Sequence, residues 1–393
     1  MLNDPEMHQN LHQTPKVALL IKLPGILSER ILAGITRYVG PDGRWSLVPE
    51  IGFSGPEWLT SSRWDGIIYF PSYPGLSPLI QSTKTPVVVL HGLSNGFDLP
   101  WVDLDNAAIG RMGADHLIER GFLNFAFCGF SDCDWSPLRA DSFRATVEEK
   151  GFPVALHEST LTAGGSDWND RINEIAQWLK GLPKPIGIMA CNDHRGINVI
   201  DACRRAGFRI PEDVAIVGAD NEARCQFCNP PLSSIRMNVE RMGYEAAKLL
   251  DSLMKGESLP EKGIMIPPIG VMTRQSTDTL ATADWLVAEA ARFIRQNAWH
   301  GCKVSDVQKH LHVGRTTLKA HFQKALNRSP QSEIHRVRIE RIKSMLSHMD
   351  LTLAQIAEET GFEHAEYLGI FFKRETGLAP SEYRKHILNS DDG

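Results

Sequence analysis

The stretch GIMACNDHRGINVIDACRRAGFRIPEDVAIVGADN, residues 187–221, decides the fold of the first part of the chain. Short apolar runs lie near its two ends, at 186–191 and 214–218, and have the length and composition of buried parallel strands. Between them, 195–206 has the spacing of an amphipathic helix and is followed by Gly207, which suits the left-handed residue after a helix. The stretch is therefore predicted to be a strand–helix–strand unit of a parallel sheet.

The same alternation continues on both sides of this unit. Further apolar runs of strand length occur at 17–23, 66–70, 86–91 and 124–130. Further helical patterns occur at 28–39, 106–120, 139–150, 168–179 and 241–255. Strands that alternate with helices predict a doubly wound α/β architecture, and about 260 residues are enough for two lobes of similar build.

The character of the sequence changes after Val271. Residues 274–284 (RQSTDTLATAD) are polar, small and without periodicity, as linkers are. Beyond them no strand pattern remains, and helices are predicted at 285–297, 305–311, 315–325, 331–348, 353–359, 364–375 and 380–388. We therefore predict an N-terminal tail (1–15), a two-lobed α/β domain (16–273), a linker (274–284), an all-α domain (285–388) and a C-terminal tail (389–393).

Charge is shared unevenly between the two predicted domains. Residues 285–388 hold 16 Lys+Arg against 11 Asp+Glu, a balance of +5, so the rest of a chain whose net charge is −5 carries −10. A small basic module joined to a larger acidic one is typical of a nucleic-acid reader with a separate control domain. On charge alone, the basic excess could equally belong to an ordinary helical face exposed to solvent.

Two stretches of the all-α domain, 304–325 and 352–374, share a helix-turn-helix pattern. In each, the longer helix carries an inward Leu and Phe four residues apart, and a proline follows where the next helix begins. One helix of such a unit fits the major groove while the other crosses the backbone. Two units can therefore read groove segments about 34 Å apart. The alternative is an ordinary helical bundle in which the two stretches are similar by chance.

The all-α domain resembles the AraC-type DNA-binding domain. The residues that carry the resemblance best are Ile356-Ala357, Gly361-Phe362, Phe371-Phe372-Lys373, Gly377, Pro380 and Tyr383-Arg384. The resemblance implies base contacts from Arg315, Thr316 and Lys319 in the first unit and from His364, Glu366 and Tyr367 in the second. Lys373, Arg374, Arg384 and Lys385 are assigned to phosphates.

The chemistry of these side chains differs between the two units. Arg315 or Lys319 can pair with guanine, and Thr316 can touch a thymine methyl. Glu366 can accept a hydrogen bond from cytosine, or it can remain a solvent-facing acid. Two residues of the first unit depart from the family pattern, since His312 occupies the turn where glycine is usual and Asn327 replaces the glycine that closes the second helix.

The α/β domain resembles the effector-binding domain of LacI/GalR-type repressors and the periplasmic sugar-binding fold. Besides 187–221, the matching stretches are 139–151 (RADSFRATVEEKG), 232–242 and 266–277. In that fold the ligand lies between the lobes, against the carboxyl ends of the strands.

The resemblance implies that Arg139, Asp193 and Asp220 contact a sugar. Carboxylates accept hydrogen bonds from neighbouring hydroxyls, and a guanidinium donates to others. Trp135 could stack on the apolar face of a pyranose. For Asp193 the alternative is a helix N-cap, and for Trp135 it is a place in the core.

The sequence lacks the common catalytic and cofactor motifs. It contains no dinucleotide fingerprint after the first predicted strand, no Walker loop, no G-x-S-x-G and no H-E-x-x-H. The pair Cys225-x-x-Cys228 has no second pair at zinc spacing. We therefore expect no enzyme, no cofactor and no metal site.

The two domains together resemble bacterial regulators of sugar catabolism. This implies a cytoplasmic transcription activator of pentose genes that responds to a sugar, with D-xylose as the expected effector. It also implies a homodimer that binds direct repeats in double-stranded DNA and acts with RNA polymerase. A different monosaccharide, a repressor, and a sugar-binding protein with a helical partner-binding module remain open. The sequence predicts neither a signal peptide nor a membrane span.

Overall fold

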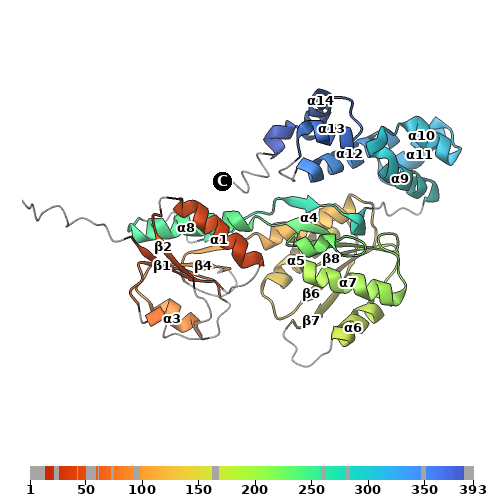
Figure 1. Ribbon diagram of the computed structural model, residues 1–393. Helices are drawn as coiled ribbons and strands as arrows, with labels where there is room; N and C mark the ends of the chain where they lie inside the picture. The colour runs from red at the N-terminus through yellow and green to blue at the C-terminus, as the bar shows by residue number, and fades with distance from the viewer. Residues whose placement is uncertain are drawn as a thin grey trace, which may run out of the picture. The chain divides into compact units, whose positions relative to one another are not determined.

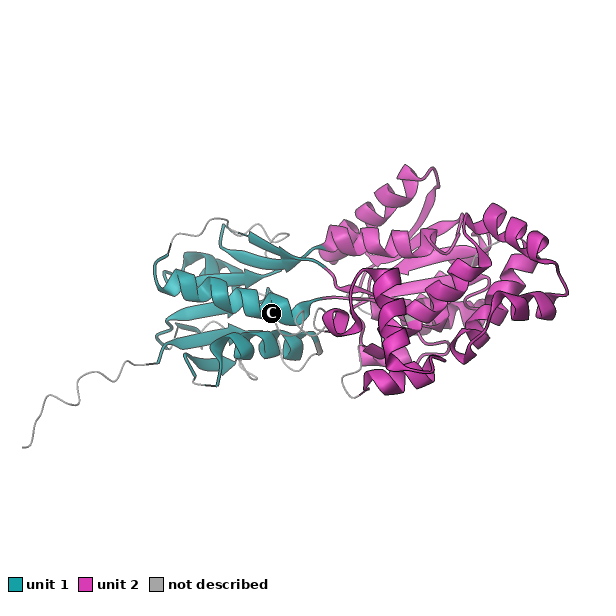
Figure 2. Ribbon diagram, turned by 90° about the horizontal axis from the view of Figure 1, so that it is seen from above, with its two compact units in different colours: residues 1–105, 238–267 teal, residues 106–237, 268–393 magenta. Residues whose placement is uncertain are grey.

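In the computed structural model the chain forms two compact units, residues 1–105 with 238–267 and residues 106–237 with 268–393 (Figure 2). The structure describes residues 14–21, 26–41, 43–49, 59–60, 62–71, 75–91, 98–161, 168–257, 263–278, 284–346 and 351–384. The predicted C-terminal tail and residues 1–13 of the predicted N-terminal tail lie outside this part of the chain. The chain passes between the two units three times, at 105/106, 237/238 and 267/268.

The first unit is built on a parallel six-stranded sheet in the order β11-β5-β4-β3-β1-β2. Its strands are β1 (Lys16–Leu20), β2 (Ser46–Pro49), β3 (Gly66–Tyr69), β4 (Val87–Leu90), β5 (Trp101–Leu104) and β11 (Gly263–Ile266). Its helices are α1 (Ile26–Val39), α3 (Ser77–Ser82) and α8 (Val239–Met254). Helices α1 and α8 lie side by side in Figure 1. A Cβ at Gly34 would stand 1.9 Å from the carbonyl oxygen of Glu240, so only glycine permits this approach.

The second unit contains another six-stranded sheet, in the order β12-β10-β9-β8-β6-β7. Its strands are β6 (Phe125–Phe130), β7 (Val154–Ser159), β8 (Ile186–Ala190), β9 (Val214–Ala219), β10 (Ser233–Arg236) and β12 (Gly270–Met272). Only the β10–β12 pairing is antiparallel. Its helices are α4 (Asn106–Ile118), α5 (Trp135–Glu149), α6 (Trp168–Lys180) and α7 (Asp193–Ala206), with the short 3-10 turns η2 (Ala223–Gln226) and η3 (Gln275–Thr277).

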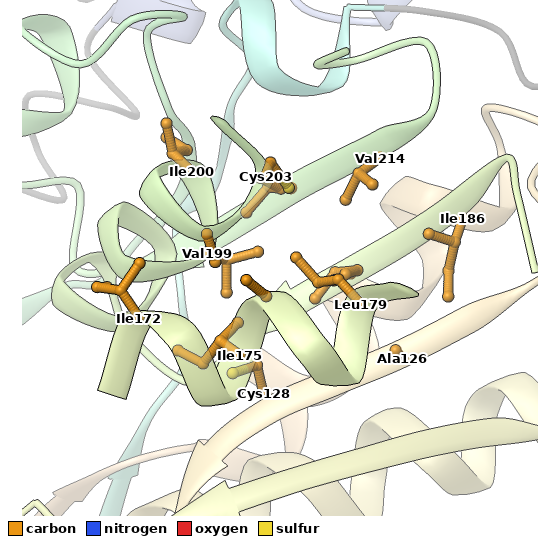
Figure 3. Packing of buried hydrophobic residues seen from close by; sticks show 14 of the residues in the cluster. Ala126, Cys128, Ile172, Ile175, Leu179, Ile186, Val199, Ile200, Cys203 and Val214 are labelled. Atoms are coloured by element: carbon orange, nitrogen blue, oxygen red, sulfur yellow. The ribbon is translucent and has the colours of Figure 1, made fainter. Parts of the chain in front are cut away.

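One core of this unit lies between helices α6 and α7 and the sheet (Figure 3). Ile175 and Leu179 of α6 and Val199 of α7 are fully buried, facing the strand residues Ile186 and Val214. Burying an aliphatic side chain of this size contributes about 1.5–3 kcal/mol. The apolar runs that predicted the strands therefore form the layer on which both helices rest.

The second unit also contains the all-α domain. Its helices are α9 (Trp285–Asn297), the turn η4 (Ala298–His300), α10 (Val304–Leu311), α11 (Arg315–Leu326), α12 (Pro330–Leu346), α13 (Leu353–Glu359) and α14 (Ala365–Thr376). Two clusters of buried apolar residues hold these helices together. Helix α12 contributes to both clusters, since Ile334 packs with α9–α11 and Ile342 packs with α13 and α14. The predicted two-lobed α/β domain followed by a double helix-turn-helix domain is confirmed.

Several elements escaped prediction because their sequences lack continuous apolar runs. Strand β7 alternates half-buried and exposed residues at a sheet edge, and β10 begins with two serines that are fully buried. Strand β5 contains Asp103, which is buried. A polar residue inside a buried strand is tolerated only when distant partners satisfy it, which local periodicity does not reveal.

The predicted linker at 274–284 is corrected in its first half. Ser276 and Thr277 are fully buried against the second sheet. The hydroxyl of Ser276 donates to the carbonyl of Ile216 at 2.6 Å, and Arg120 Nε donates to the carbonyl of Thr277 at 2.9 Å. The polar residues that resembled a linker therefore form hydrogen bonds to strand β9 and to Arg120, which follows α4. Residues 279–283 lie outside the described part of the chain.

Candidate functional site

The predicted sugar-contacting residues follow three neighbouring strands of the second sheet. Trp135 and Arg139 belong to the first two turns of α5, which comes after β6. Asp193 begins α7 after β8, and Asp220 directly follows β9. Because β9, β8 and β6 are adjacent and parallel, their carboxyl ends share one edge of the sheet.

Arg139 has a buried guanidinium fixed by several partners, and the residue is only 3 % exposed. Its Nε donates to Oδ1 of Asn106 at 2.9 Å, and its Nη1 donates to the carbonyl of Cys191 at 2.6 Å. The guanidinium also lies 4.6 Å from the ring centroid of Trp135, which is half-buried. A guanidinium held in this way loses little side-chain entropy when it binds a ligand. The partner Asn106, the first residue of α4, escaped the sequence analysis.

Asp220 and Asn221 form a turn with unusual backbone geometry. Their φ angles are 114° and 52°, a region that costs residues with side chains about 1–3 kcal/mol. The amide of Asn221 donates to Oγ of Ser234 at 2.9 Å, and its Oδ1 accepts from Nη2 of Arg274 at 2.7 Å. These contacts hold the turn in place at the carboxyl end of β9.

Asp193 is placed differently from Arg139, because it is fully buried. Its Oδ1 accepts from Oγ of Ser234 at 2.5 Å, and its Oδ2 accepts from the amide of Glu222 at 2.8 Å. Burial raises the pKa of Asp193 to about 6, although hydrogen bonds from Ser234, Cys225 and the Glu222 amide lower it. Both oxygens therefore support the turn that carries Asp220.

The N-cap interpretation of Asp193 is wrong. The capping residue of α7 is Asn192, whose side chain accepts from the amide of Arg195 at 2.9 Å. Asp193 is the first helical residue and points inward, because its oxygens find donors on β10 and on the turn after β9. Asn192 therefore caps the helix and Asp193 supports the turn after β9, and the sequence alone did not distinguish these two roles.

Arg195 is a further buried residue at this edge of the sheet that the sequence analysis missed. It is fully buried, and its guanidinium lies 4.1 Å from the ring centroid of Phe130. Its Nη2 donates to the carbonyl of Gly129 at 2.9 Å and to Oγ of Ser159 at 2.5 Å. Arg195 thereby joins the carboxyl ends of β6 and β7. Its place in a helical pattern gave no signal of this role.

The first unit carries a polar pair at the carboxyl edge of its own sheet. Nδ1 of His91, which follows β4, lies 2.8 Å from Oδ1 of the buried Asp103. The ring of His91 meets that of Phe70 edge-on at 5.0 Å. Imidazole and carboxylate can bind hydroxyl groups, and the sequence analysis missed both residues because neither belongs to a recognisable motif.

The first helix-turn-helix unit consists of α10 and α11. Helix α10 ends at Leu311, and the residue that caps it, His312, has a φ of 54°, the left-handed conformation that glycine favours at such turns. The departure at His312 therefore leaves the turn intact. Arg315, Thr316 and Lys319 are exposed on α11. The opposite side of α11 packs into the core of the domain.

The second helix-turn-helix unit consists of α13 and α14. Thr352 caps α13 in a reciprocal pair of hydrogen bonds with Gln355. His364, Glu366 and Tyr367 are exposed at the start of α14, and the rings of His364 and Tyr367 lie 5.9 Å apart. The structure thus exposes all six residues predicted to face DNA bases.

The residues assigned to phosphates differ in their surroundings. Lys373 is exposed on α14. Arg374 is also exposed, and its Nη2 donates to Glu375 at 2.8 Å. Arg384 is half-buried, and its Nη2 donates to the carbonyl of Leu351 at 2.6 Å, so it braces the start of α13. Lys385 lies outside the described residues.

The described residues contain no group of three or more His, Cys, Asp or Glu side chains placed to hold a metal ion. All seven cysteines are free thiols, and burial raises the pKa of Cys225 well above its usual value. None of the described helices is both long and apolar enough to cross a bilayer.

Comparison with known proteins supports this two-part organisation. Residues 114–277 match a periplasmic binding protein-like domain, and residues 307–386 match a helix-turn-helix domain. The xylose operon regulatory protein of Haemophilus influenzae is 32% identical over 379 residues, which cover 94% of this chain and 98% of that protein. This chain belongs to the family of xylose operon regulatory proteins.

Further relatives agree with this family assignment. The xylose operon regulatory protein of Escherichia coli K12 is 27% identical over 94% of this chain and 96% of that protein. The solved structure of the xylose-binding transcription activator xylR matches with a TM-score of 0.61 and 26% identity, over 94% of this chain and 98% of that one. The relatives are DNA-binding transcription regulators, which confirms that this family member is a regulator and not an enzyme.

Proposed function

We propose that this regulator activates genes of pentose catabolism in the cytoplasm when D-xylose binds to its α/β domain. The observation that carries the proposal is the guanidinium of Arg139, which is buried and held over the ring of Trp135 by hydrogen bonds to Asn106 and to the carbonyl of Cys191. Family membership supports D-xylose as the sugar, since its relatives are named as regulators of the xylose operon or as xylose-binding.

The chemistry of this edge of the sheet suits a polyol. Arg139 donates to hydroxyl oxygens, Asp220 accepts from neighbouring hydroxyls, and Trp135 offers an aromatic face. Asp193 acts indirectly, because its carboxylate fixes the turn that presents Asp220. A few hydrogen bonds to charged groups, each about 1.5–3 kcal/mol, reach the roughly −8 kcal/mol of micromolar binding.

The helical domain is proposed to bind direct repeats in duplex DNA. Arg315, Thr316 and Lys319 of α11 contact bases, and α14 contacts a second box with its exposed first turns. Lys373 and Arg374 contact phosphates, whereas Arg384 serves the fold of the domain through Leu351. The active species is proposed to be a homodimer that acts with RNA polymerase.

Titration calorimetry with D-xylose, L-arabinose, D-ribose and D-glucose tests the sugar assignment. We expect micromolar binding of D-xylose, and a loss of about 100-fold or more in Asp220→Asn, because two charge-assisted hydrogen bonds weaken. Asp170→Asn, an exposed acid on α6 of the same unit, is the matched control and should bind as the wild type does. Tight binding of another sugar alone would replace D-xylose, and unchanged binding by Asp220→Asn would remove Asp220 from the site.

A further inference from the structure

The outward surface of α14 differs from that of α11 in an unexpected way. Tyr367 is 60 % exposed and Ile370 is 67 % exposed. Three residues apart, these two side chains lie on one side of the helix. An exposed isoleucine beside an exposed tyrosine makes a small apolar surface, with the exposed Lys373 one turn beyond it.

Packing fixes this side of α14 toward the outside. Leu368, Phe371 and Phe372 are buried on the other side of the helix. The ring of Phe371 lies 5.2 Å from that of Phe362 and meets the ring of His335 edge-on at 5.2 Å. Turning Ile370 inward would pull these rings out of the core, so its exposure is a property of the fold.

The two recognition helices can be compared position by position. Their buried Leu and Phe residues are offset by 50 residues, and the same offset matches Ile370 with Ala320 and Tyr367 with Thr317. Thr317 and Ala320 are both exposed on α11, and the long polar side chain on their side of the helix is the exposed Lys324, four residues beyond Ala320. Helix α14 therefore presents apolar groups where α11 presents small or polar ones.

We propose that Ile370, with Tyr367 beside it, reads thymine methyl groups in the major groove. The C5-methyl of thymine is the apolar group that base edges display there. Covering one methyl changes affinity about four-fold, the factor that corresponds to about 0.8 kcal/mol per buried CH₂. The inference rests on the proposed placement of α14 in the groove, and it makes the second unit a reader of A·T pairs.

Deoxyuridine scanning tests this directly with the full-length protein. An operator is first selected from random duplexes, and each thymine is then replaced by deoxyuridine, which removes only the methyl group. We expect the wild type to bind about four-fold more weakly when one or two thymines of the second box are replaced. Ile370→Ala should bind the parent operator more weakly by a similar factor and should no longer distinguish thymine from deoxyuridine at those positions.

Leu123→Ala is the matched control, because Leu123 is 62 % exposed and lies in the α/β part of the second unit. It should leave both the affinity and the deoxyuridine effect unchanged. A wild type indifferent to every replacement, or an Ile370→Ala variant that keeps the wild-type pattern, would overturn the proposal. So would an Ile370→Ala variant with normal operator binding and lost transcription, which indicates a protein contact. A selected operator with no second box would instead contradict the placement of α14.

Discussion

Nη2 of Arg274 lies 2.7 Å from Oδ1 of Asn221, the residue that follows Asp220. The same guanidinium donates through Nη1 to the carbonyl of Leu232 at 2.8 Å. Arg274 also stands where the chain leaves the α/β domain, just before the buried η3 turn. A single side chain therefore joins the proposed sugar-binding turn to the segment that leads to the DNA-binding domain.

Removing this link should uncouple sugar binding from DNA binding. In Arg274→Ala, D-xylose should still bind within about five-fold of the wild type, because Arg274 is not proposed to touch the sugar. The change in operator affinity on adding D-xylose, typically 1–3 kcal/mol in coupled systems, should fall toward zero. Operator titrations with and without the sugar measure it.

Asn221→Gly checks the same link from its other end, since glycine removes the acceptor and tolerates the positive φ of 52°. It should reproduce the loss of coupling seen in Arg274→Ala. A full sugar response in both variants would show that the signal travels by another route.

The stability of the α/β domain should depend on pH through Asp193. Its pKa is raised to about 6 in the folded protein from an ordinary value of 3.8, so its contribution to stability is complete below pH 4 and is lost as pH rises through 6. Asp193→Asn does not titrate, and its melting temperature should rise relative to the wild type between pH 4 and pH 7. Thermal melts of both proteins across this range provide the measurement.

Asp213→Asn is the control, because its effect on stability should change with pH in the opposite direction. A hydrogen bond from Arg209 holds the pKa of Asp213 below its usual value, so its contribution is present above pH 4 and is lost as the pH falls. This variant should lose stability relative to the wild type at neutral pH and approach it in acid. The same trend in both variants would contradict the assignment of Asp193.

Arg315 and Lys373 should have different effects on DNA binding. Arg315→Ala should weaken operator binding by about 1–3 kcal/mol and relax one base position. Lys373→Ala should weaken binding to operator and random duplexes alike and reduce the salt dependence, because a phosphate contact carries no sequence information. Equal loss on random DNA in Arg315→Ala would reassign Arg315 to the backbone.

Glu333 should be important for the stability of the helical domain. It is fully buried, with Nε of Arg328 at 2.8 Å and Nη2 of Arg336 at 2.7 Å from its oxygens. Burial alone would raise the pKa of Glu333, but Arg336 and Arg328 bring it below the usual value. Glu333→Gln leaves the half-buried guanidinium groups of Arg328 and Arg336 without their counter-charge and should cost about 1–3 kcal/mol.

Thermal unfolding followed by circular dichroism measures this cost. Glu363→Gln, an exposed acid in the turn of the second helix-turn-helix unit, should melt as the wild type does. If Glu333→Gln also melted at the wild-type temperature, the buried cluster would contribute nothing to stability.

The sequence predicted elements whose signals lie within a few neighbouring residues. Helices α9 and α13 were predicted with the bounds that the structure shows, because both have clear polar N-caps and apolar periodicity. Strands β6, β8 and β9 were found because they are apolar throughout. Edge strands such as β7 were missed because their alternation is weak.

The candidate site was predictable only in part. The resemblance to the sugar-binding fold implied the same role for Asp193 and Asp220, but only the folded chain shows that Asp193 is buried and bonded to Ser234 and to the amide of Glu222. The roles of Asn106 and Arg195 could not be predicted, because each depends on a partner more than 30 residues away in the sequence.

By itself, the amino-acid order determined the kinds of element, their succession and the two-domain plan, since periodicity, caps and turn residues act over single helical turns. Tertiary structure alone decided which polar side chains are buried, which of them support others, and that Ser276 and Thr277 pack against the sheet instead of forming a linker. The reason is physical. A polar group is buried only where the fold supplies its hydrogen-bond partner, and for Ser276 that partner is the carbonyl of Ile216, 60 residues earlier in the chain.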